Sequence, residues 1–162
     1  MAKKTQFEVL LDVRETQRDD LEAKLADALS ELERRRSFVQ RKQRALEDVR
    51  AEIGELEERR DALLESASFQ PRQLATLDSH GDSLAEQARE KEAALSRARK
   101  SVEEQQARCQ EARAELAEAQ KALEAVRKHY QKQRQKQELV AKRKQQTRND
   151  EIASRRWWEE NK

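Results

Sequence analysis

The stretch that decides the fold is SASFQPRQ, residues 66–73 of a 162-residue chain. It holds the only proline of the sequence, Pro71, and it is the clearest break in an otherwise regular spacing of apolar residues. Proline fits the first turn of a helix and disfavours helix in the residue before it. The sequence therefore predicts one helix, a short turn and a second helix.

Before this turn, apolar residues recur every seven positions in two rows spaced three and four residues apart, which is the a/d seam of a coiled coil. The rows are Leu11, Leu25, Leu32, Val39, Leu46 and Ile53, and Phe7, Leu21, Ala28, Val49, Leu56 and Leu63. Cations also occupy seam positions, at Arg14, Arg18, Arg35, Lys42 and Arg60. Because their stems can lie along the seam while the charge reaches water, we expect a continuous but locally weak seam.

After the turn, a second pair of rows keeps its phase from residue 74 to residue 140. The rows are Leu74, Ala88, Leu95, Val102, Cys109, Leu116, Leu123 and Tyr130, and Leu77, Leu84, Ala98, Ala112, Ala119, Val126 and Val140. The frequent alanines let two helix backbones approach closely. The chain is therefore predicted to be all-α: a single, long antiparallel two-helix coiled-coil hairpin, with helices over about 6–66 and 72–157 and a turn over about 67–71.

The two predicted helices differ in length. A turn centred on Phe69 places residue i opposite roughly residue 138 − i, so residues beyond about Gln131 have no partner on the first helix. They form a carboxyl-terminal helical overhang, and Trp157 is expected ~40 Å beyond the start of the first helix, at 1.5 Å per residue. Ser79-His80-Gly81-Asp82 offers an alternative start for the second helix, with Ser79 and Asp82 as caps.

Composition restricts the class of protein. With 42% charged residues, 35% hydrophobic residues and two glycines, the chain has the profile of long helices rather than of a compact core. The single cysteine, Cys109, excludes an internal disulfide and fits a reducing compartment. No apolar run approaches the ~20 residues of a membrane span, so we expect a cytoplasmic protein without membrane insertion.

The sequence gives no support for catalysis. It has no glycine-rich phosphate loop, its histidines His80 and His129 are far apart, and no Cys/His cluster has metal-ligand spacing. Paired acids such as Glu57-Glu58 are typical of solvated helix faces. We therefore expect a protein that is not an enzyme, with no catalytic residue, no cofactor and no metal.

A basic segment coincides with the predicted overhang. Residues 127–148 hold nine cations against one acid, Glu138, a net charge of +8 in a chain of net charge +2. The cations are Arg127, Lys128, Lys132, Arg134, Lys136, Lys142, Arg143, Lys144 and Arg148. Such a segment is a solvated surface, a nucleic-acid contact through phosphate neutralisation, or a contact with an acidic protein cavity. Tyr130 is its only aromatic residue, so base stacking has weak support.

Both tryptophans of the chain lie in one motif, Arg155-Arg156-Trp157-Trp158. Tryptophan and arginine are the residue types enriched at interface hot spots, so we expect these four residues to bind a partner. A frayed terminus is the bland alternative. Membrane contact has little support because the apolar face is limited to Ile152, Ala153 and the indoles.

The amino-terminal residues resemble the opening of a known family. Residues 7–17, FEVLLDVRETQ, are followed by Leu21, Leu25, Ala26, Ala28 and Leu29, and residues 149–153 read NDEIA. This pattern is similar to that of the FliJ family and of the YscO/SctO-type proteins of virulence secretion systems. The similarity in detail covers residues 7–29 and 149–153, and the chain length and hairpin pattern fit as well. The motif of residues 155–158 is not a general feature of that family.

The resemblance implies a non-enzymatic central stalk of a type III secretion or flagellar export apparatus. Such a stalk inserts its terminal end into a hexameric secretion ATPase and contacts the cytoplasmic domain of the export gate, at the cytoplasmic face of the inner membrane. We expect residues 127–148 and the motif at 155–158 to contact the ATPase ring, and Phe69, Arg72 and Leu74 at the hairpin tip to contact the gate. Secretion chaperones are further candidate partners, and the stalk is expected to be a monomer.

Two other classes stay open at this point. A generic coiled-coil scaffold or adaptor would dimerise through its seam, doubling both mass and length relative to a monomeric hairpin. A nucleic-acid-binding rod is the weaker alternative, and it would show salt-sensitive retention on DNA or RNA.

Overall fold

A computed structural model describes residues 5–161 of the chain. It contains two helices, α1 (Gln6–Glu65) and α2 (Pro71–Glu160), and residues 5–161 include no strand. The predicted all-α class and antiparallel helix pairing are confirmed. The chain divides into two compact units, which are best described one at a time.

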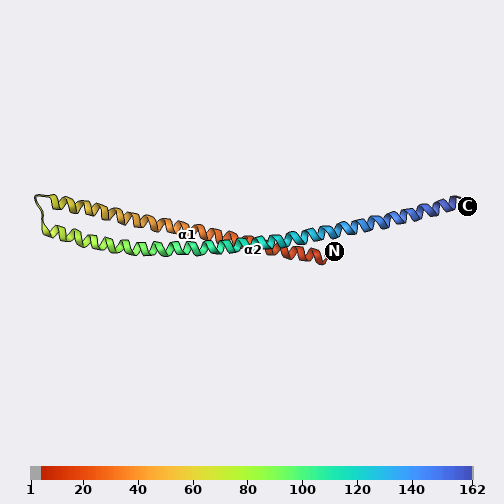
Figure 1. The fold of residues 1–162 in the computed structure, drawn as a ribbon, viewed down its shortest axis with the longest axis horizontal. Helices are drawn as coiled ribbons and strands as arrows, with labels where there is room; N and C mark the ends of the chain where they lie inside the picture. Colours follow the sequence, from red (N-terminus) through yellow and green to blue (C-terminus); the bar gives the residue numbers. More distant parts are fainter. Residues whose placement is uncertain (1–4, 162) are drawn as a thin grey trace. The chain divides into compact units, whose positions relative to one another are not determined.

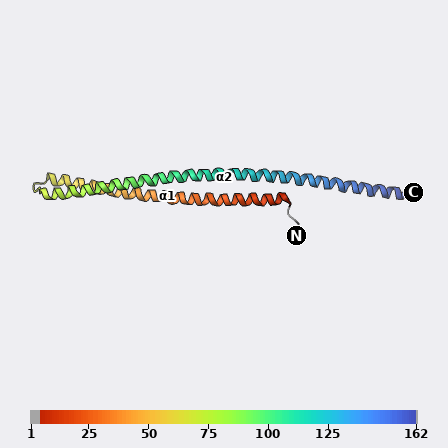
Figure 2. The same cartoon turned by 90° about the horizontal axis from the view of Figure 1, so that it is seen from below.

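The turn unit comprises residues 24–113 and contains the connection between the helices. Figures 1 and 2 show α1 and α2 running side by side away from this connection. The turn occupies residues 66–70, and Pro71 is the first residue of α2. Proline suits this position because its missing N–H would have no partner in the helix. The hydrogen bonds of the helix begin at once, since Gln73 N and Leu74 N donate to Gln70 O at 3.0 and 3.4 Å.

The core of the turn unit follows the heptad rows. Its buried apolar residues are Leu32, Leu46, Val49, Leu56, Leu84, Leu95, Ala98, Cys109 and Ala112. All nine belong to the rows read from the sequence. Leu56 and Leu84 form a cluster with Val49, against which Ile53, Leu77 and Ala88 pack. A Cβ added to Gly81 would lie 3.5 Å from Leu56 Cδ2, so this glycine faces the seam.

Polar side chains also cross the seam of the turn unit. Gln105 is 4% exposed, and its amide donates to Ala28 O at 3.0 Å. Arg35 donates to Ser101 O at 3.1 Å and to Ser101 Oγ at 2.9 Å. These pairs lie within a few residues of the register expected from a turn at Phe69. Because a buried polar group is costly without its partner, they favour one register of the two helices over others.

The terminal unit comprises the described residues 5–23 and 114–161. Within it, the start of α1 packs against α2, and Leu123 is its one buried side chain. The seam cations Arg14 and Arg18 are half-buried, as expected from their long stems. Arg14 donates to Gln17 at 3.0 Å, and Arg18 pairs with Asp19. The seam of this unit therefore holds far less buried apolar area than the seam of the turn unit.

The bounds and composition of the two helices settle three further points. α2 is continuous through residues 79–82, so the alternative start there is wrong. α1 ends at Glu65 and α2 extends to Glu160. Within residues 5–161, neither helix contains a stretch apolar enough over a sufficient length to cross a membrane.

We predict that truncating a seam leucine destabilises the protein, whereas truncating an exposed leucine of the same helix does not. Leu84 is 2% exposed and Leu139 is 57% exposed. Leu84→Ala should lower the free energy of unfolding by about 2–4 kcal/mol, because it removes buried methyl groups and leaves a cavity. Leu139→Ala should change it by less than ~0.5 kcal/mol. Urea denaturation followed by circular dichroism measures both, and equal effects would contradict the assignment of the seam.

Candidate partner-binding surfaces

The first candidate surface is the part of α2 that extends beyond the start of α1. Thr5 and Glu8 form a capping box, in which Thr5 N donates to Glu8 Oε2 at 2.7 Å and Glu8 N donates to Thr5 Oγ1 at 3.3 Å. Tyr130 Oη donates to Glu8 Oε1 at 3.2 Å, and the ring centroids of Phe7 and His129 lie 5.3 Å apart. These contacts mark the end of the helix pairing, and α2 has no partner helix beyond Tyr130.

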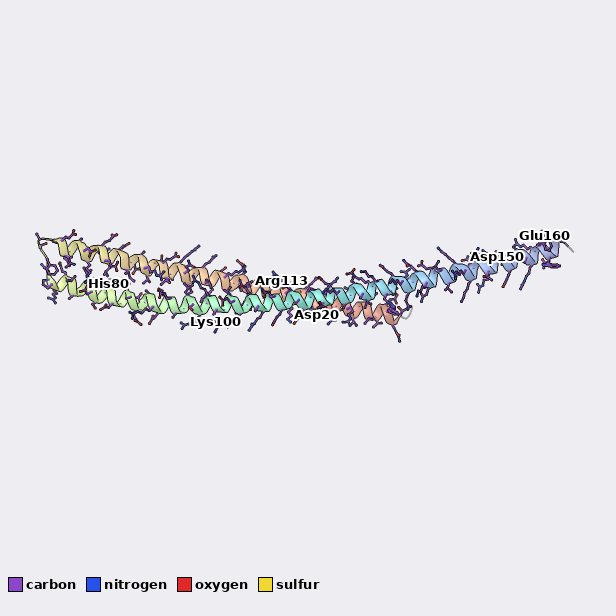
Figure 3. All side chains as sticks on the ribbon, viewed as in Figure 1. Asp20, His80, Lys100, Arg113, Asp150 and Glu160 are labelled. Atoms are coloured by element: carbon purple, nitrogen blue, oxygen red, sulfur yellow. The ribbon has the colours of Figure 1, made fainter. Side chains whose placement is uncertain are left out.

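Every residue of α2 from Gln131 to its end at Glu160 is exposed, as is Asn161. Large apolar side chains in this stretch have no cover, with Leu139 57% and Val140 51% exposed. Figure 3 shows side chains projecting both above and below the ribbon of α2 around Asp150 and Glu160. The predicted overhang is therefore a helix without a partner, and not a segment folded back on α1.

Most cations of the basic segment, residues 127–148, have no acidic partner. Arg127 pairs with Glu15 at 2.5 Å, and Arg134 lies 3.8 Å from Glu138. Lys128 donates to Glu124 at 2.7 Å, which lowers the pKa of that carboxyl. The other cations of residues 127–148 form no ion pair within residues 5–161: Lys132, Lys136, Lys142, Arg143, Lys144 and Arg148. Six uncompensated positive charges thus lie on about five turns of bare helix.

The tryptophan motif is part of the same helix. Trp157 and Trp158 are 59% and 66% exposed, and their rings meet edge to face at 5.6 Å. Asn161 caps this end, since its backbone N and its side-chain Nδ2 both donate to Trp157 O, at 3.1 and 2.8 Å. A shallow groove beside the indole is lined by Asn149, Ile152, Ala153, Arg156, Trp157 and Glu160. The indoles thus lie exposed at the end of a helix whose last carbonyls are capped by Asn161.

The second surface is the hairpin tip, in the turn unit. Phe69 is 40% exposed, Arg72 is exposed and Leu74 is half-buried on the seam side. Leu64, 52% exposed, adds apolar area beside the turn. A shallow depression on the first turns of α2 runs from Arg72 to Ser83 and includes His80, which is labelled near the turn in Figure 3.

A third surface was missed by the sequence reasoning. Residues 34–44, RRRSFVQRKQR, hold six cations and no acid, and residues 93–102 hold three cations and no acid. We call these two segments together the cationic belt. Arg35 reaches Ser101, and Arg99 donates to Gln43 Oε1 at 3.4 Å, so the turn unit brings both segments to one level. The signal was visible as the run of arginines, but the belt becomes apparent only when charges from both helices are counted together.

Comparison with family models, with curated proteins and with solved structures finds no match to this chain. The fold and the surfaces above therefore rest on the sequence and the structure alone.

We predict that both indoles are open to solvent. Because Trp157 and Trp158 are the only tryptophans, acrylamide quenching of the intrinsic fluorescence reports on them alone. Quenching should approach that of a free tryptophan derivative, as expected for indoles more than half exposed. Strong protection from acrylamide in the isolated protein would show that the motif packs against another part of the chain.

Proposed function

We propose that this chain is a non-enzymatic central stalk of a type III secretion or flagellar export apparatus. The observation that carries the proposal is the bare overhang, a helix with uncompensated positive charge and two exposed indoles. The resemblance of residues 7–29 and 149–153 to the FliJ and YscO/SctO families supplies the class of machine.

In this proposal the overhang enters the acidic opening of a hexameric ATPase ring. The cations of residues 127–148 attract it there, since long-range electrostatics favours encounter and orientation more than tight binding. A single helix in a six-fold ring contacts the protomers unequally. It can therefore bias their conformations in turn, provided that its contacts differ between conformations.

The motif Arg155-Arg156-Trp157-Trp158 provides the anchor at the end of the overhang. Burial of an indole removes a large apolar area from water, and a neighbouring arginine adds a charged hydrogen-bond donor. The cations upstream then contribute attraction, whereas the indoles contribute the dissociation barrier.

The hairpin tip faces the export gate in the same proposal. Phe69, Arg72 and Leu74 contact the cytoplasmic domain of the gate, which places the protein at the cytoplasmic face of the inner membrane. Secretion chaperones are further proposed partners. The stalk acts as one copy for each ring, unlike a coiled-coil scaffold, which pairs through its seam.

The direct test measures ATP turnover and oligomer size of the cognate ATPase with and without this protein. A variant with Lys136, Lys142, Lys144 and Arg148 changed to Gln should lose at least about tenfold in apparent affinity at low salt. A control variant with Arg59, Arg89, Arg108 and Arg113 changed to Gln carries the same net charge and should stay within about twofold of the wild type.

If neither the wild type nor the variants alter turnover or oligomer size at low salt, the proposal is wrong. Salt-sensitive retention on DNA or RNA in the same preparation would then favour a nucleic-acid-binding rod.

The indole anchor makes a separate prediction. Trp157→Ala with Trp158→Ala should weaken ATPase binding about 10- to 100-fold, as for hot-spot residues, while the salt dependence of binding stays unchanged. Sedimentation with fluorescently labelled stalk at two salt concentrations measures both quantities. A double variant that binds like the wild type would remove the motif from the interface.

A further inference from the structure

One side of the terminal unit is distinguished by a shallow groove between α1 and α2. Gln17 and Leu21 of α1 and Glu118, Ala119 and Ala122 of α2 are among the residues that line it. Residues seven apart share a face of a helix in a coiled coil, so these faces can be followed along both helices. We call this side of the unit, with the residues that share its helix faces, the grooved flank.

The exposed surface in the middle of the grooved flank is apolar or neutral. Leu10 is 39% exposed, and Val13 beside it is 57% exposed. On α2 the same stretch presents Ala125 and His129. Arg14, the nearest cation on α1, is half-buried in the seam. Exposed apolar side chains that gather at one place mark an interaction site, here in a chain with 42% charged residues.

The two ends of the grooved flank carry opposite charges. Toward the turn it presents Asp20, which is labelled in Figure 3, and Glu118. Toward the overhang it presents Lys132 and Lys136, which are exposed and form no ion pair in the described part of the chain. Asp20 is likewise exposed without an ion pair in residues 5–161, whereas Glu118 pairs with Lys121 at 2.8 Å. Along the flank the order is therefore acidic, neutral, basic.

The two acids toward the turn lie at one level of the helix pair. Tyr130 Oη donates to Glu8 at 3.2 Å, and Asp20 and Glu118 each lie twelve residues further along the two antiparallel helices. On the same count, Leu11 and Arg127 lie three residues from this contact. We call the level of Leu11 and Arg127, within the neutral stretch, the axial level.

Two copies of the grooved flank match when they lie face to face and antiparallel, about a two-fold axis at the axial level. Lys136 is nine residues from that level on the overhang side, and Asp20 and Glu118 are nine residues from it on the turn side. Lys136 of one copy therefore meets both acids of the other, while Leu10 and Val13 of the two copies meet around the axis. Each contact occurs twice, as in an isologous interface. A parallel pair in register would set like charges against each other.

The difference in helix length leaves room for the overhang in this arrangement. α1 of the second copy begins at Gln6, so beyond this residue the overhang of that copy is the helix that faces the groove. The overhang can then lie between α1 and α2. Leu139, 57% exposed, comes within one helical turn of Leu21 in the groove. The contact therefore adds apolar area to the charge pairs.

The match repeats one heptad further on. Arg143 lies on the same face of the overhang as Lys136, and each helix of the hairpin carries another acid seven residues toward the turn, Asp27 and Glu111. Arg143, Asp27 and Glu111 are exposed, and none of them forms an ion pair within residues 5–161. A single register thus sets opposite charges together at two successive levels.

We propose that the terminal unit pairs with a second copy of this chain, antiparallel and face to face through the grooved flank. The base of each overhang then lies on the acidic end of the other copy's flank, and each copy keeps its own seam. The pairing does not depend on the stalk function. One consequence does rest on it: a paired chain has the base of its ATPase contact covered, so pairing and insertion into the ring exclude each other.

The pairing should be weak and sensitive to salt. Exposed ion pairs contribute little each, and the Debye length falls from about 10 Å at 0.1 M salt to about 3 Å at 1 M. Sedimentation equilibrium of the wild type at about 100 µM and about 50 mM NaCl should show a monomer–dimer equilibrium. Its dissociation constant should rise at least about tenfold by about 0.5 M NaCl. At the low micromolar concentrations of fluorescence and hydrogen-exchange measurements, the monomer predominates.

Two charge-reversal variants give the sharpest test. The overhang variant carries K136E and R143E, and the flank variant carries D20K, D27K, E111K and E118K. Each should be monomeric alone at low salt, because like charges then face each other across the pair. Mixed in equal amounts, they should form a heterodimer, since the reversed overhang of the first meets the reversed flank of the second and the two unaltered surfaces also meet.

A matched control carries K144E and R148E, and it should dimerise like the wild type. Lys144 continues the seam row of Leu123 and Tyr130, and Arg148 continues the row of Arg127, so both lie on faces of α2 away from the grooved flank. Circular dichroism of each variant verifies that the helices are retained. The salt series needs only the wild type, so the test does not depend on how well any variant folds.

The proposal is overturned by a wild type that is monomeric at low salt and about 100 µM. It is equally overturned by assemblies larger than a dimer, by reversal variants that dimerise alone as the wild type does, or by a mixture of the two variants that stays monomeric. Retention of the wild type on heparin without self-association would assign the overhang cations to a polyanion and reject the second copy.

Discussion

The difference in length between the two helices is the constraint on which the rest of the structure depends. α1 has 60 residues and α2 has 90, and the capping box of Thr5 and Glu8 sets the level at which α1 begins. An α-helix satisfies its backbone hydrogen bonds internally, so α2 can continue beyond that level without a partner. Its side chains then face solvent on every side, which leaves the overhang available for contact with another molecule.

Apolar burial and charge have separate places in this chain. The turn unit holds nine buried apolar side chains, whereas Leu123 is the one buried side chain among residues 5–23 and 114–161. Both units carry cations in the seam, Arg14 and Arg18 in the terminal unit and Arg35, Lys42 and Arg60 in the turn unit, so the difference between the units lies in the number of buried apolar side chains. Because a helix pair is stabilised mainly by its apolar seam, most of the folding stability must come from the turn unit. The surfaces of the overhang and of the cationic belt consist mainly of exposed charged side chains, with a few exposed aromatic rings.

Much of the fold could be predicted because heptad spacing is a strong and regular signal. Every buried apolar residue within residues 5–161 belongs to a row predicted from the sequence, and Pro71 marks the start of α2. Gln105 occupies the seam position midway between Ala98 and Ala112, so the heptad spacing predicts its burial; its hydrogen bond to Ala28 O could not be predicted, because the spacing does not specify which backbone carbonyl faces the amide. The capping box could have been predicted from the spacing Thr5-x-x-Glu8. The cationic belt combines two segments, residues 34–44 and 93–102, that lie far apart in the sequence, so a charge count along either helix alone does not reveal it. Whether the tip and overhang residues bind the proposed partners cannot be read from the fold, since exposure permits binding without naming a ligand.

The unpartnered state of the overhang is tested most directly by amide hydrogen exchange of the isolated protein. Amides around Leu84 and Leu95 lie beside buried seam residues and should exchange only through unfolding of the pair. Amides of residues 131–160 need only local fraying of a single helix, so they should exchange faster by orders of magnitude. Equal protection in the two regions would show that the overhang is packed against another surface, and the account of a bare, charged helix would be wrong.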